Sequence, residues 1–108
     1  MFRLFDRGFK SMAMGEALQE AQRNPGIRLI DVRTVAEYRQ GHIPGSLSLP
    51  LDRWQQIEDA VPDKTTPLYV YCLSGARSQS ACQGFVSLGY MSVTNIGGIG
   101  SYAGPVER

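Results

Sequence analysis

The residues best placed to do chemistry are a cysteine and the short loop that follows it. Cys72 ends an apolar run, residues 68–71, and a loop with Gly75 leads from it to Arg77, where a helical pattern begins. The first N–H groups of a helix lack intrahelical partners and attract an anion. A thiol that faces them is stabilised as the thiolate, the nucleophilic form. The spacing therefore predicts a reactive Cys72, with simple burial of the thiol as the alternative.

The segments on either side form the elements that must position this cysteine. Residues 68–71 are apolar with no polar alternation, which is typical of a strand buried on both faces of a parallel sheet. Beyond the loop, Ala81, Phe85 and Leu88 recur at helical spacing and predict an amphipathic helix. Cys72 is thus expected at the carboxyl edge of a sheet, where open α/β sheets bind their ligands.

Three blocks of the sequence resemble the rhodanese-like sulfurtransferase family. Residues 72–78 are similar to the family's C-x-x-G-x-R-S loop, and residues 31–46 resemble its D-V-R-x-x-x-E-Y-x-x-G-H-I-P-G-A block. Residues 97–102 resemble its G-G-x-x-x-W ending, with Tyr102 in place of the usual Trp. The resemblance implies a rhodanese-like α/β fold: a mostly parallel five-stranded sheet, helices on both faces and the active-site loop at its carboxyl edge, as the alternation of strands and helices also indicates.

The resemblance also implies sulfur transfer through Cys72. The thiolate would take a sulfane sulfur from thiosulfate or a similar donor, hold it as a persulfide, and pass it to cyanide or to a thiol, a thioredoxin-like protein included. No metal and no organic cofactor is implied. Since the side chains of Leu73, Ser74 and Ala76 are uncharged, 3-mercaptopyruvate is an alternative donor to dianionic thiosulfate. The groups expected to bind the anionic sulfur belong to Leu73, Ser74, Gly75, Ala76 and Arg77.

A cysteine loop of this kind also occurs in proteins with other functions. A cysteine phosphatase places five residues between its Cys and Arg, whereas four separate Cys72 from Arg77, so this loop is too small for phosphate. A non-catalytic interaction module is disfavoured because Cys72 is present. A sulfur carrier or relay that acts on a protein partner uses the same chemistry and stays open.

The remaining chemistry-bearing residues are predicted to be structural. Cys82 lies on the apolar stripe of the helix and is expected to pack there, with a resolving thiol for Cys72 as the alternative. His42, the only histidine, excludes a multi-histidine zinc site. A Cys–His pair is disfavoured because an ionised thiol needs no base. Asp31 and Arg33 are expected to form an ion pair that fixes loops, although Arg33 at the pocket rim is an alternative.

The other expected elements follow from local patterns. Thr34 and Glu37 have the spacing of a capping box. Asp52 is expected to cap a helix over residues 52–60 that turns Trp54 and Ile57 inward. The pattern predicts a further helix over residues 15–24, strands over 27–32, 46–49 and 90–95, and a flexible glycine turn at 97–100 near the site.

The whole chain is expected to form a single domain, residues 1–108, since 108 residues suffice for one core. A net charge of +1 gives no reason to expect nucleic acid or a membrane as partner. Charges interrupt the apolar residues of segment 1–10 too often for a signal peptide; an edge strand is expected there, with an interfacial helix as the alternative. Two cysteines without an export signal predict free thiols in the cytoplasm.

Overall fold

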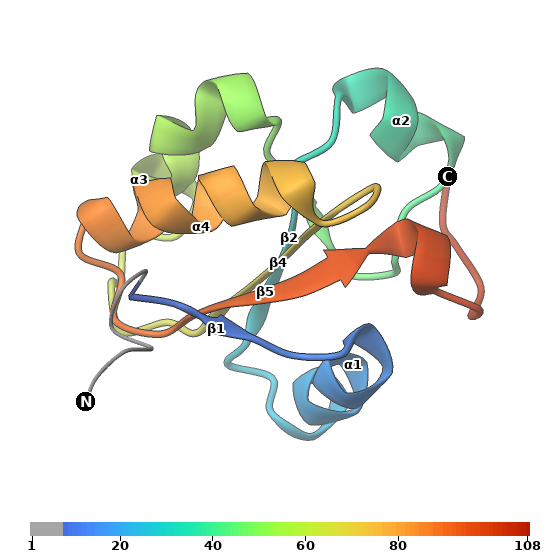
Figure 1. Ribbon diagram of the computed structural model, residues 1–108, viewed down its shortest axis with the longest axis horizontal. Helices are drawn as coiled ribbons and strands as arrows, with labels where there is room; N and C mark the ends of the chain where they lie inside the picture. The colour runs from blue at the N-terminus through green and yellow to red at the C-terminus, as the bar shows by residue number, and fades with distance from the viewer. Residues whose placement is uncertain (1–7) are drawn as a thin grey trace.

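A parallel sheet of five strands forms the centre of the structure, a computed structural model that describes residues 8–108 (Figure 1). Its spatial order is β1-β5-β4-β2-β3, and each neighbouring pair is parallel. The strands are β1 (Lys10–Ser11), β2 (Arg28–Asp31), β3 (Leu47–Ser48), β4 (Leu68–Cys72) and β5 (Val93–Gly98). All residues of β4 are buried, as expected for the central strand of a sheet covered on both faces.

Helices cover both faces of the sheet, as the sequence predicted (Figure 1). The helix α4 (Ala76–Ser87) packs on one face together with the 3₁₀ segment η2 (Leu51–Gln56) and α3 (Ile57–Ala60). The helix α1 (Met14–Arg23) covers the opposite face. The short helix α2 (Val35–Gln40) lies near the carboxyl edge, and the 3₁₀ turn η3 (Ile99–Ser101) follows β5.

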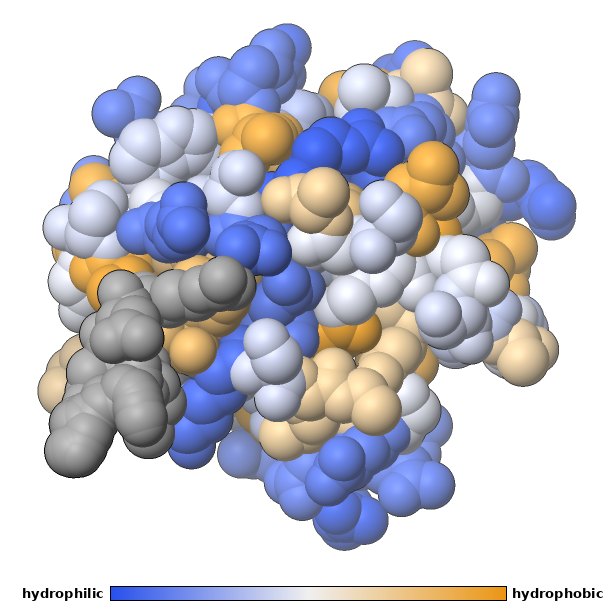
Figure 2. All heavy atoms as spheres, in the orientation of Figure 1, coloured by the Kyte–Doolittle hydropathy of each residue, from blue (hydrophilic) through white to orange (hydrophobic). Residues whose placement is uncertain are grey.

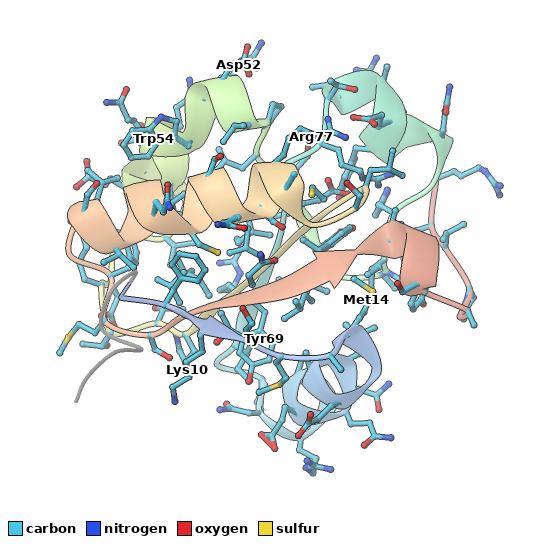
Figure 3. The ribbon with its side chains drawn as sticks, viewed as in Figure 1. Lys10, Met14, Asp52, Trp54, Tyr69 and Arg77 are labelled. Atoms are coloured by element: carbon cyan, nitrogen blue, oxygen red, sulfur yellow. The ribbon has the colours of Figure 1, made fainter. Side chains whose placement is uncertain are left out.

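The core consists of two apolar layers, one on each side of the sheet. Ile30 and Val70 face the α4 side, whereas Tyr69 packs with Met14 on the α1 side (Figure 3). Trp54 packs partly buried against the α4 layer, and a Cβ on Gly84 of α4 would lie 2.5 Å from its ring. The outward side of α1 is hydrophilic (Figure 2), and no helix among residues 8–108 is long and apolar enough to span a membrane.

The expected helix over residues 52–60 is only partly right. The segment begins as a 3₁₀ turn at Leu51, and backbone angles at Arg53 (φ −122°, ψ 25°) separate it from the α-helical turn at Ile57. Asp52 is exposed and is not the cap residue, a position that Pro50 takes. The cause is a long-range contact, since the Leu51 N–H donates to the Val32 carbonyl and fixes where the turn starts.

The strand expected over residues 90–95 was placed too early. The strand begins at Val93, which pairs with Leu68 of β4. Tyr90 instead anchors the preceding turn, because its ring is buried and its hydroxyl donates to the carbonyls of Ile57 and Val61. The strand also continues through Gly98, so the expected flexible glycine turn at residues 97–100 is the end of β5 followed by η3.

A buried ion pair ties the end of β2 to the turn at residues 41–46. The Arg33 guanidinium contacts Asp31 at 2.6 Å and donates to the Gly41 carbonyl at 2.8 Å, which confirms the predicted pair. The Tyr71 hydroxyl accepts from the Ile43 N–H at 3.1 Å. These bonds leave the polar groups of the turn satisfied where they are buried.

Tyr71→Phe should lower the free energy of unfolding by about 1–3 kcal/mol, because it strands the buried Ile43 N–H and the Ser46 hydroxyl that contacts the Tyr71 oxygen at 3.0 Å. Urea denaturation measures the effect. Tyr102→Phe is the matched control, since the Tyr102 hydroxyl donates to the Pro105 carbonyl at an exposed site. Equal costs for the two substitutions would contradict the role given to the Tyr71 hydroxyl.

Candidate active site

Cys72 lies at the carboxyl end of β4, and the loop after it curls around its sulfur. The Gly75 N–H donates to Sγ at 2.9 Å, and the Ser78 hydroxyl oxygen lies 3.5 Å from Sγ. Cys72 is only 1% exposed, so the loop rather than water supplies the partners of the sulfur. The expected strand–loop–helix arrangement is confirmed, with the helix beginning at Ala76, one residue earlier than predicted.

These contacts decide the ionisation of the thiol. Burial raises the pKa of Cys72, but hydrogen bonds from the hydroxyl and N–H of Ser78 and from the N–H groups of Gly75 and Ser74 outweigh it. The net effect places the pKa of the thiol below its ordinary value. Hydrogen bonds to the charged form of a group favour that form, so the loop stabilises a thiolate on β4.

Two glycines allow the loop to take this shape. Gly75 has φ of 104°, a left-handed conformation that points its N–H at the sulfur. Gly98 lets β5 approach the loop, because a Cβ there would lie 2.1 Å from the Leu73 oxygen. The same oxygen accepts from the Gly100 N–H at 3.2 Å. The glycines at the end of β5 therefore seat the loop.

Arg77 points toward α2 at the start of α4, where it forms a two-point ion pair with Glu37 (Figure 3). The two N–O distances are 2.8 and 3.0 Å. Glu37 also accepts from the Thr34 N–H at 2.8 Å in the predicted capping box, which is confirmed. The Arg77 guanidinium and then the Thr34 N–H lower the pKa of Glu37 to about 2. Arg77 is thereby held as a brace between α4 and α2.

The other predicted loop residues form the rim of the site. Ser74 and Ala76 are exposed, and the side chain of Leu73 is an exposed apolar group, 50% accessible. Beside the loop lies a shallow hollow of about 480 Å³. Arg77 and Val32 line it, together with Leu51 and Arg53. Of the predicted site residues, Arg77 alone lines the hollow, and Cys72 does not.

Cys82 and His42 make structural contacts away from the sulfur of Cys72. Cys82 is fully buried, both cysteines are free, and burial raises the pKa of Cys82 to about 12. The His42 ring stacks on Tyr38 with centroids 3.6 Å apart, and its Nδ1 lies 2.9 Å from the Tyr38 carbonyl. Within residues 8–108 no group of three or more His, Cys, Asp or Glu side chains could hold a metal ion.

Two polar residues beneath the sulfur were not predicted as site residues. Ser78 was noted only as the last residue of the loop motif, and Asn95 of β5 was taken as a strand residue. The Asn95 Oδ1 accepts from the Ser78 hydroxyl at 2.7 Å. The amide of Asn95, a residue type that is uncommon inside strands, was the one signal in the sequence that could have singled it out.

Comparisons with known proteins identify the family. Residues 14–104 match the rhodanese-like domain. The chain is 39% identical to the Escherichia coli thiosulfate sulfurtransferase PspE over 77 residues, which cover 70% of this chain and 74% of that protein. It is 41% identical to a sulfurtransferase of Allochromatium vinosum over 78 residues, 71% of this chain and 72% of the other.

A solved structure agrees with the sequence relatives. A rhodanese with anions from Escherichia coli superposes with a TM-score of 0.71 at 36% identity, covering 76% of this chain and 98% of that one. The chain belongs to the rhodanese-like family, as the sequence motifs implied.

Gly98→Ala should displace the loop, because the new Cβ meets the Leu73 carbonyl at 2.1 Å. We expect a loss of about 1–3 kcal/mol in the free energy of unfolding and a slower alkylation of Cys72, whose N–H partners move away. Denaturation and iodoacetamide kinetics measure the two effects. Gly15→Ala is the control, since a Cβ there meets nothing within 4 Å. A Gly98→Ala protein with unchanged Cys72 reactivity would contradict the seating of the loop on β5.

Glu37→Gln should remove a pH-dependent part of the stability. Because the Arg77 guanidinium holds the pKa of Glu37 at about 2, below the ordinary 4.5, the carboxylate stabilises the fold above pH 4.5 and loses this effect as the pH falls toward 2. Allowing for partial solvent screening, we expect a contribution of about 1–2 kcal/mol at neutral pH. Urea unfolding at several pH values measures it. Glu20→Gln, whose pair with Arg23 is exposed, should have little effect.

Proposed function

We propose that this protein is a sulfurtransferase that carries sulfur as a persulfide on Cys72. The observation that carries the proposal is the sulfur of Cys72 itself, buried yet supplied with a 2.9 Å hydrogen bond from the Gly75 N–H and with a pKa below its ordinary value. The thiolate is the nucleophilic form of cysteine, and these hydrogen bonds favour it. The similarity to PspE, which is named a thiosulfate sulfurtransferase, supports the same chemistry.

In the first half-reaction the Cys72 thiolate attacks the sulfane sulfur of thiosulfate. A bond forms between Sγ and that sulfur, the sulfur–sulfur bond of thiosulfate breaks, and sulfite leaves with the electron pair. The negative charge now resides on the outer sulfur of the persulfide. The backbone N–H groups of Leu73, Ser74, Gly75, Ala76 and Arg77 line the loop and stabilise this charge, as preorganised donors do in other enzymes.

In the second half-reaction a thiolate or cyanide attacks the outer sulfur of the persulfide. The bond between the two sulfurs of the persulfide breaks, and its electron pair returns to Sγ as the Cys72 thiolate. Donor and acceptor therefore bind in turn to the same loop, which gives ping-pong kinetics. Neither half-reaction needs a metal or an organic cofactor, because each is a nucleophilic displacement at a sulfur atom in which the leaving group takes the electron pair.

The charge of the side chains at the rim of the site affects which sulfur donor binds. The positive charge of Arg77 is compensated by Glu37, and the exposed side chains of Leu73, Ser74 and Ala76 are uncharged. This favours weak binding of dianionic thiosulfate and leaves 3-mercaptopyruvate as the alternative donor.

A second candidate function is that of a sulfur carrier or relay with a protein partner. The exposed apolar side chain of Leu73, directly after Cys72, favours it as a contact for a protein acceptor such as a thioredoxin-like thiol protein. A cytoplasmic location belongs to the same proposal, since both cysteines are free thiols.

Intact mass after incubation with thiosulfate tests the function. We expect a gain of one sulfur atom that cyanide or dithiothreitol removes. Cys72→Ser should gain none, and Cys82→Ser should gain sulfur as the unchanged protein does, because Cys82 is buried with a raised pKa.

If thiosulfate gives no gain, the same measurement with 3-mercaptopyruvate follows. Failure with both donors would reject the general sulfurtransferase and leave the relay or the interaction module. Sulfur retained by Cys72→Ser would show that another residue carries it.

A further inference from the structure

The amide of Asn95 is fixed in one orientation beneath the active-site loop. Its Oδ1 accepts from the Gly97 N–H at 3.0 Å, and its Nδ2 donates to the Gly75 carbonyl at 3.3 Å. Rotating the amide by half a turn would set a donor against a donor and an acceptor against an acceptor. Oδ1 therefore faces Ser78 as an acceptor, 2.7 Å from its hydroxyl oxygen.

The Ser78 hydroxyl has more acceptors than it can serve. Ser78 is fully buried, and its hydroxyl has a single hydrogen to donate. Three acceptors surround its oxygen: Asn95 Oδ1 at 2.7 Å, the Gly75 carbonyl oxygen at 3.0 Å and Cys72 Sγ at 3.5 Å. When Cys72 is a thiol, the short bond to Asn95 takes this hydrogen and the S–H group donates to Ser78. When Cys72 is a thiolate, the sulfur has no hydrogen and needs the hydroxyl as a donor.

We propose that Asn95 is a positioning residue that competes with Cys72 for the Ser78 hydrogen and so favours the states in which Sγ is uncharged. Those states are the thiol and the persulfide; the thiolate is the state that Asn95 disfavours. The persulfide part of this inference rests on the proposed function, whereas the competition for the hydrogen does not.

The Ser78 hydrogen can alternate between Asn95 and Cys72 as Sγ gains and loses its charge in each turnover of the proposed reaction. Loading moves the negative charge from Sγ to the outer sulfur, while the Sγ–S bond forms and sulfite leaves with its electron pair. The Ser78 hydroxyl can then return to Asn95. Asn95 therefore stabilises the loaded protein relative to the unloaded thiolate, and it keeps the free thiolate less stabilised, hence more nucleophilic, than Ser78 alone would make it.

The charged groups around Cys72 do not change this assignment. On α4, Arg77 is paired with Glu37 of α2, and Cys82 is buried with its pKa raised to about 12. The strand β5 carries no titratable side chain. Asp31, the last residue of β2, pairs with Arg33 beside Tyr71 on the other face of the sheet.

The pH profile of Cys72 alkylation by iodoacetamide, followed at Cys72 by mass spectrometry, tests the competition. Asn95→Ala should move the midpoint down by about half a unit, because Ser78 is freed for the thiolate while the Gly75 carbonyl still competes. The isosteric Asn95→Asp should move it up, since a carboxylate holds the Ser78 hydrogen more strongly. Ser78→Ala should also move it up.

The double variant Asn95→Ala with Ser78→Ala should match Ser78→Ala alone, since Asn95 acts through Ser78. Thr94→Val is the control: Thr94 is buried on the same strand but faces the opposite side of the sheet, so the midpoint should not move. Mere damage to the loop would raise the midpoint for both Asn95 variants. An unchanged or raised midpoint in Asn95→Ala, or a shift that persists without Ser78, overturns the proposal.

The loaded fraction provides the second readout. In mixtures of thiosulfate and sulfite at a pH above the alkylation midpoint, where free Cys72 is the thiolate, Asn95→Ala should lower the ratio of persulfide to free Cys72 by about threefold, the same factor as its change in ionisation. Intact mass gives this ratio. An unchanged ratio beside a lowered midpoint would overturn the link to loading. If no variant takes up sulfur at all, the proposed function fails while the alkylation profiles still decide the role of Asn95.

Discussion

A sulfur anion buried in a protein is stable only if N–H and O–H groups surround it, and the structure around Cys72 is arranged to meet that requirement. Cys72 and Cys82 are almost equally inaccessible to solvent, yet the pKa of Cys72 is lowered and that of Cys82 is raised to about 12. Burial acts on both in the same direction. Cys82 lies deeper in the protein, and Cys72 has donors near its sulfur, of which the Gly75 N–H at 2.9 Å is the closest.

The donors depend in turn on backbone contacts made far along the chain. Gly75 can turn its N–H inward only if the loop lies flat against β5, and that approach requires a glycine at position 98. The start of α4 is braced through Arg77 to Glu37, which the Thr34 cap holds in place. Two separate segments, the end of β5 and the start of α2, thus fix one short loop. This explains why the family motifs are spread over the chain although they meet at one loop.

Much of this could be predicted because the signals are local. The apolar run ending at Cys72, the helical stripe after it and the spacing of Thr34 and Glu37 each specify a structure within a few residues. The errors arose where a distant contact decides. Leu51 starts its turn because it bonds to Val32, and Tyr90 is drawn into the core by carbonyls of α3 and the residue after it. Asn95 was overlooked because its partners lie on other elements.

The source of the positive potential in the loop determines which negatively charged groups it stabilises. Because Glu37 neutralises Arg77, the positive potential at Cys72 comes from oriented N–H groups and the N-terminus of α4, which act over a short range. Such dipoles stabilise a charge on the sulfur held within the loop more than a charge that remains outside it. In the persulfide that we propose on Cys72, the single charge lies within reach of these N–H groups, whereas thiosulfate carries a second charge on its sulfonate oxygens. For the proposed function, the loop therefore favours the loaded cysteine over the bound donor, and the exposed, uncharged side chain of Leu73 bears on which donor binds.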